Sequence, residues 1–96
     1  AIQQAEVLDA GTEKVFTVAS NGARPVIVVV DPSDLSDIAL DIIGADGALL
    51  TTANYSGPGG AETGYVLPLG AASLSVKVRE VNGAASAFQI VVITLQ

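Results

Sequence analysis

The sequence predicts an all-β protein: a single antiparallel β-sandwich, jelly-roll-like, with about eight short strands. Three observations predict this class. Apolar and polar residues alternate over short stretches, turn-forming residues interrupt these stretches at short intervals, and no long segment keeps a helical period. The chain of 96 residues shows no internal repeat and no domain boundary, so we expect one domain over residues 1–96.

The first three strands are expected near residues 3–8, 13–19 and 25–31. In the second, Phe16 and Val18 alternate with polar neighbours and are expected to point inward. The third contains the uninterrupted β-branched run 26–30, which is typical of a strand that is covered on both faces. Asn21-Gly22 predicts the turn between the second and third strands, because these residue types accept a positive φ at little cost.

The middle strands are expected around residues 38–43, 49–50 and 63–67. The first of them places Ile38, Leu40 and Ile42 on one face and Asp41 on the other. Asp46-Gly47 predicts a hairpin between the first two. In the segment 63–67, Tyr65 shares a face with Leu67, and we expect Tyr65 to join Phe16 and Phe88 in the core.

The last two strands are expected at residues 74–80 and 87–95, with Asn82-Gly83 as the turn between them. In the first, Leu74, Val76 and Val78 alternate with polar residues, which indicates one wet face. The second contains another β-branched run, residues 90–93. In a protein of two layers, the outer face of the runs 26–30 and 90–93 must be covered by a loop or by another molecule.

The composition excludes most enzyme chemistries. The chain has no His and no Cys, and therefore lacks the usual general base near neutral pH, a thiolate nucleophile and the soft ligands of transition metals. The net charge of −6 and four scattered cations disfavour nucleic acid as a partner. The longest apolar run is too short to cross a membrane. We expect a protein without enzymatic activity and without a cofactor.

The best candidate metal site is the acidic segment that contains Asp31, Asp34 and Asp37. Calcium binds oxygen ligands of this kind in loops, so the segment has suitable chemistry. However, Asp side chains in loops also bind their own backbone and make turns, and the spacing differs from that of an EF-hand. Both interpretations, a calcium site and a set of turns, are open at this point.

Three segments are candidates for contact with a partner. Residues 1–8 are either an N-terminal arm or an ordinary edge strand. The glycine-rich loop 54–60 presents a tyrosine, a residue type that is favoured at interfaces, although such a loop can also be a plain spacer. Two cations on the outer face of the strand 74–80 are either a solvated face or a contact with an acidic partner. The candidate interface residues are Ile2, Gln3, Gln4, Tyr55, Lys77 and Arg79.

From Phe16 to Val92, the order of features resembles the bacterial pre-peptidase C-terminal (PPC) domain, a β-sandwich appended to secreted proteases. The segments that carry the resemblance are 16–18, 36–50, 65–68, 74–78 and 82–92. Two features depart from the family. The chain has few aromatic strand residues, and Gly70-Ala71-Ala72-Ser73 stands where the family has a glycine-tyrosine approach to the penultimate strand. The resemblance implies a sandwich fold and an extracellular binding module, secreted or at a cell surface.

The composition also suggests a second kind of protein. Half of the residues are apolar, 15% are charged and the mean hydropathy is +0.56, which is apolar for a protein whose whole surface meets water. In size and composition the chain resembles, by type, the small decoration proteins that coat tailed-phage capsids. We therefore expect a structural protein that binds a capsid shell or a similar protein assembly in a virion. The composition also suits a homo-oligomer.

Overall fold

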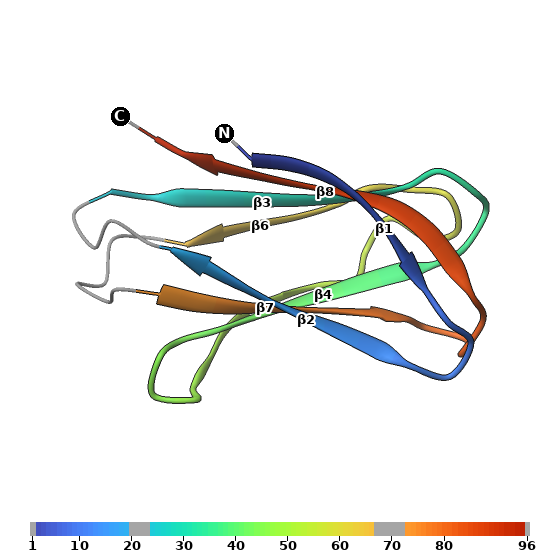
Figure 1. Cartoon of the computed structure of the whole chain (residues 1–96), viewed down its shortest axis with the longest axis horizontal. Helices are drawn as coiled ribbons and strands as arrows, with labels where there is room; N and C mark the ends of the chain where they lie inside the picture. Colours follow the sequence, from blue (N-terminus) through green and yellow to red (C-terminus); the bar gives the residue numbers. More distant parts are fainter. Residues whose placement is uncertain (1, 20–23, 67–72, 96) are drawn as a thin grey trace.

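The computed structural model describes residues 2–19, 24–66 and 73–95, and these form two stacked antiparallel sheets (Figure 1). Sheet A has the strand order β1–β8–β3–β6 and sheet B has the order β2–β7–β4–β5. No helix capable of reaching across a bilayer occurs in these ranges. The strands are β1 (Ile2–Leu8), β2 (Glu13–Ala19), β3 (Val26–Pro32), β4 (Ile38–Ile43), β5 (Leu49–Ala53), β6 (Glu62–Val66), β7 (Ser73–Glu80) and β8 (Ser86–Thr94).

The strand order is jelly-roll-like and confirms the predicted fold class. β1 pairs with β8, β2 with β7, β3 with β6 and β4 with β5, as if one long hairpin had been folded over into two sheets. Two of the predicted turns are present. Gly47 has a φ of 85° and Gly83 a φ of 76°, the left-handed conformation for which glycine is favoured. The predicted turn at Asn21-Gly22 lies outside the described residues.

The core lies between the two sheets and is built almost entirely from aliphatic side chains. Phe16 and Phe88 meet edge to face across the layers, with ring centroids 6.3 Å apart. Phe88 is buried, and Phe16 packs against the cluster from the β2 side, as expected from the sequence. The buried cluster consists of Leu8, Val18, Val26, Val28, Val30, Ile38, Leu40, Ile42, Ala53, Val66, Leu74, Val76, Val78, Phe88, Ile90 and Val92.

The prediction that Tyr65 joins the core is wrong. The inward residues of β6 are Glu62, Gly64 and Val66, and Tyr65 points outward with half of its surface exposed. The space at Gly64 is small: a Cβ added there would lie 2.7 Å from Cδ1 of Ile42 on the opposite sheet, and the end of that side chain would have to move. A buried glutamate and a buried glycine do not follow an apolar alternation, which is why the sequence pattern indicates the wrong face.

The N-terminal segment is an edge strand, which is one of the two interpretations that its sequence allows. β1 is paired with β8 along its whole length, from Ile2 opposite Val92 to Leu8 opposite Ser86. On its free side, Nζ of Lys14 donates to the carbonyl oxygen of Val7 (3.0 Å) and forms an ion pair with Glu6. These contacts connect the edge of sheet A to the neighbouring strand β2.

Candidate functional site

The outward surface of sheet A carries a continuous group of apolar side chains. Cross-strand pairing places Tyr65, Ile27 and Ile93 in one row, and the next row adds Val29 and Val91. The four aliphatic residues are half-buried, and Tyr65 is 50% exposed. These five residues are called the outer apolar face below.

No described strand lies over the outer apolar face, because sheet B packs only against the opposite side of sheet A (Figure 1). The sequence predicts that the runs 26–30 and 90–93 are covered on both sides. Their buried inward residues are 6% exposed or less, which confirms the cover on that side. On the outward side the described residues provide no such cover. The outer cover is therefore not supplied by the described residues, and both predictions for it, a loop and another molecule, stay predictions.

A shallow groove of about 540 Å³ continues this surface toward the ends of β3 and β1. In the row next to Val29 and Val91, Asp31 lies opposite Gln89, and Gln89 lies opposite Ala5. Nε2 of Gln3 donates to Oε1 of Gln89 (3.0 Å), which fixes two of the polar side chains at the border of the face. The groove is lined by Ala5, Glu6, Val7, Lys14, Asp31, Pro32, Ser33, Ala87, Phe88 and Gln89.

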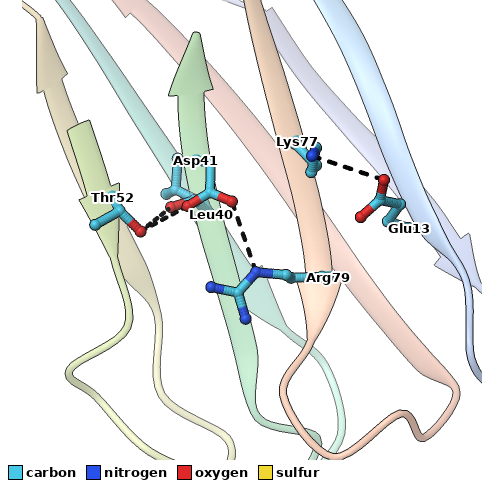
Figure 2. Close-up of polar contacts among 6 residues, drawn as sticks. All are labelled: Glu13, Leu40, Asp41, Thr52, Lys77 and Arg79. Carbon is cyan, nitrogen blue, oxygen red and sulfur yellow. Dashed lines mark hydrogen bonds and ion pairs between the residues drawn. The ribbon is translucent and has the colours of Figure 1, made fainter. Parts of the chain in front are cut away.

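The outward surface of sheet B carries the exposed Val15 and a set of charges that are paired with one another (Figure 2). Nζ of Lys77 lies 3.7 Å from Oε1 of Glu13, and Nε of Arg79 lies 3.6 Å from Oδ2 of Asp41. Oγ1 of Thr52 donates to Oδ1 of Asp41 (2.6 Å). The two predicted interface cations, Lys77 and Arg79, are thus part of a network within the chain.

Tyr55 lies against the free edge of sheet A. Its hydroxyl donates to the carbonyl oxygen of Thr63 (3.2 Å) and accepts from the backbone N–H of the same residue (3.3 Å). Thr63 belongs to β6, an edge strand whose outer backbone groups would otherwise be open to another strand. The ring itself is 69% exposed, so Tyr55 both shields this edge and remains accessible as the predicted contact residue.

Of the three carboxylates in the predicted calcium site, only that of Asp34 makes hydrogen bonds within the described residues. The carboxylate of Asp34 accepts from the backbone N–H groups of Ser36 and Ala87 (both 3.0 Å) and from the Ser36 hydroxyl. These bonds, the one from the Ser36 side chain first, lower the pKa of Asp34. The backbone N–H of Asp37 donates to Oε2 of Glu80 (2.8 Å). Within residues 2–19, 24–66 and 73–95, no group of three acidic side chains is arranged to hold a metal ion.

Two buried glutamates organise the loops beside these strands. Glu62 is fully buried and accepts from the backbone N–H groups of Tyr55 and Ser56 (both 2.9 Å). Glu80 accepts from the N–H groups of Asn82 and Ala84 in the turn after β7. The bond from Ala84, followed by that from Asp37, lowers the pKa of Glu80. The sequence contained a signal for Glu80, because the alternation of β7 places it on the same inward face as Val78.

Comparisons with known proteins show similarity of fold. No protein-family model matches the sequence, and no curated protein sequence matches it. The structure is similar to that of PliG, a periplasmic lysozyme inhibitor of g-type lysozyme from Aeromonas hydrophila, with a TM-score of 0.77 and 9% identity over 98% of this chain and 85% of that chain. It is also similar to the pre-peptidase C-terminal domain of a collagenase from Bacillus anthracis (TM-score 0.75, 11% identity, 96% of this chain and 88% of that chain). A third similar structure is the mitogen derived from Yersinia pseudotuberculosis (TM-score 0.71, 10% identity, 99% and 85%). The chain therefore has a PPC-like β-sandwich fold, which it shares with other small β-domains.

Proposed function

We propose that this chain is a non-catalytic structural protein that attaches to a larger protein assembly through the outer apolar face. The observation that carries the proposal is the group of five apolar side chains on sheet A that no described strand covers. A partner that covers this face would remove apolar surface from water, and this is the main favourable contribution in most protein associations. The adjoining groove and the fixed Gln3 and Gln89 side chains would supply the polar border that interfaces have.

The specific assembly that we propose is the capsid of a phage, with the chain acting as a decoration protein on the virion surface. A protein that binds only the assembled shell stabilises that shell by mass action. Three features suit a module that binds the shell with one face and exposes the other to solvent. They are the small size, the paired charges of sheet B and the apolar surface of sheet A that no described strand covers. In this arrangement sheet B would face the solvent.

The second candidate is a secreted binding module that attaches an enzyme to its substrate or to a cell surface. The observation that favours it is the similarity of fold to the pre-peptidase C-terminal domain of a collagenase. The same outer apolar face would then pack against the enzyme domain or its target. A calcium requirement, expected from the sequence at Asp31, Asp34 and Asp37, belongs to this candidate, although these three side chains do not form a metal-binding group among the described residues. A thermal melt with calcium and with EDTA tests that requirement, and equal midpoints would contradict it.

Density-gradient separation of material from the producing organism tests the proposal. The chain is followed by immunoblot through fractions that contain assembled particles, cell envelopes and free protein. We expect the immunoblot band in the fractions that contain assembled particles. A band in the secreted fraction, on a polypeptide that also carries an enzyme domain, would support the second candidate. A band confined to free protein that carries no enzyme domain would contradict both.

A further inference from the structure

The described part of the outer surface of sheet A contains one charge. Among the described outward-facing residues of its four strands, Asp31 is the only charged side chain. It lies on β3, an inner strand of the sheet, in the row that adjoins Val29 and Val91. Its side chain is exposed, and it forms no hydrogen bond or ion pair with any described residue. A partner that covers the outer apolar face would therefore also approach an unpaired carboxylate.

In a second copy of this chain, each cation already has a partner of its own. Lys14 is paired with Glu6, Lys77 with Glu13 and Arg79 with Asp41, and Arg24 also has an interaction partner. Each copy carries a net charge of −6, which adds a general repulsion between copies. Because Asp31 lies on an inner strand, near the end of that strand, a two-fold axis that runs parallel to the strands through the centre of this surface would bring both copies of Asp31 close together. Like charges at an interface are strongly unfavourable and suppress the wrong partner.

We propose that the outer apolar face takes a partner other than a second copy: a protein surface of apolar side chains beside a Lys or Arg that pairs with Asp31. The proposal rests on the function proposed above, because it assigns a partner chemistry to the same face. In a covered apolar interface, an unpaired carboxylate is strongly destabilising, whereas a paired one is tolerated and adds specificity. Asp31 thus has two roles, repelling other copies and selecting a cationic partner.

The chain itself provides the probe for this experiment. An Asp31→Lys variant presents the same apolar surface with a cation in place of the carboxylate, which is the chemistry that the partner must have. We expect wild-type protein alone to stay monomeric in sedimentation equilibrium. An equimolar mixture of wild type and Asp31→Lys should form a heterodimer that is at least about tenfold tighter than either protein with itself. This heterodimer should weaken at about 0.5 M salt, because salt screens the attraction between Asp31 of one chain and the introduced lysine of the other.

Two controls make the result specific. Glu13→Lys changes the net charge equally but lies on the outer surface of sheet B, so its mixture with wild type should remain monomeric. Tyr65→Asp placed in the Asp31→Lys chain should abolish the heterodimer by charging the outer apolar face. Asp31→Arg serves as a second probe if the Lys variant folds poorly, as judged by circular dichroism.

Three outcomes would overturn the proposal: a concentration-dependent dimer of the wild type, a mixture that fails to associate with either probe, or an equally tight mixture with Glu13→Lys. None of these measurements requires the natural assembly. A chain that bands with particles while its mixtures fail to associate would leave the proposed function standing and remove only the partner chemistry.

Discussion

The outer surfaces of the two sheets are built on the same strand geometry but differ in chemistry. On sheet B, outward positions hold Glu13, Lys77, Arg79 and Asp41, which pair with one another across strands (Figure 2). On sheet A, the outward positions hold mostly aliphatic residues and Tyr65, together with Thr63, Gln89 and the single charge of Asp31, and the described residues form no ion pair there. Each sheet buries its inward face in the shared core. The two sheets therefore differ in the side chains of their outward faces.

The comparison separates a face whose charges pair within the chain from a face whose described residues include one carboxylate and no ion pair. Both ion pairs on the outer surface of sheet B form between residues of this chain and need no partner molecule. The outer apolar face has no equivalent, and nothing in the core requires Ile27, Val29 or Val91 to be apolar on that side. This difference favours sheet A as the docking side.

The largest expected effect separates inward from outward residues of the same strand. Phe88→Ala removes a buried ring from β8 and should lower the free energy of unfolding by about 3–5 kcal/mol. Val91→Ala, at an outward position of the same strand, should lower it by less than about 1 kcal/mol. Urea unfolding followed by circular dichroism measures both. Equal losses would mean that the outer apolar face is already part of a closed core.

The next effect concerns the buried carboxylate at the end of β7. Glu80→Gln should lower the free energy of unfolding by about 1–3 kcal/mol at neutral pH, because Glu80 accepts three backbone N–H bonds. The pKa of Glu80 is lowered in the folded protein, so its stabilisation is present above the ordinary value of 4.5 and is lost as the pH falls through the lower folded value. Thermal melts between about pH 2 and 7 should therefore show a flatter profile for Glu80→Gln than for the wild type. Parallel profiles would contradict the assignment.

A smaller effect is expected from the paired charges of sheet B. Arg79→Gln removes the ion pair with Asp41 but keeps most of the side chain, and should change the free energy of unfolding by at most about 1 kcal/mol. The difference from the wild type should shrink as salt is added. Lys77→Gln is the matched variant on the other ion pair. Loss of particle binding in either variant would show that sheet B, and not sheet A, is the docking side.

The smallest effect on stability should accompany the clearest loss of docking. Val29→Lys combined with Val91→Glu places a charged cross-strand pair on sheet A and makes its outer surface like that of sheet B. Such pairs are worth about 0.2–1 kcal/mol, so unfolding should hardly change while the chain no longer bands with the particles. The control is Thr17→Lys with Ser75→Glu, the same change at a facing pair on sheet B, which should leave banding intact. Banding that survives the sheet A change would overturn the docking assignment.

Much of the fold could be predicted from the sequence because its strands follow local rules. Period-two alternation places Phe16, Val18 and the inward residues of β7 correctly, and two Asx-Gly pairs mark turns that require a positive φ. These signals depend on neighbours in the sequence. The pairing of β1 with β8 joins opposite ends of the described chain, and no local pattern distinguishes an edge strand from an arm.

The candidate site was predictable only in part. The β-branched runs 26–30 and 90–93 correctly indicate unusual apolar surface, but not that the two runs pair side by side on one face. The alternation misplaces Tyr65 because Glu62 and Gly64 occupy the inward positions of β6, where their burial depends on loop N–H groups and on Ile42. Lys77 and Arg79 stand out in the sequence as exposed cations, whereas their partners Glu13 and Asp41 lie on other strands and emerge only from the register.

The position of β8 has a consequence for how the protein is made. β8 lies between β1 and β3 and is hydrogen-bonded to both, although it is the last of the eight described strands in sequence order. During synthesis, β1 and β3 therefore have no common neighbour until β8 has left the ribosome. Of the described pairings, β4 with β5 is the local hairpin from which folding can start, and the others must close longer loops, which slows folding. Until then the β-branched run of β3 is exposed, and this nascent state is the one most prone to aggregation.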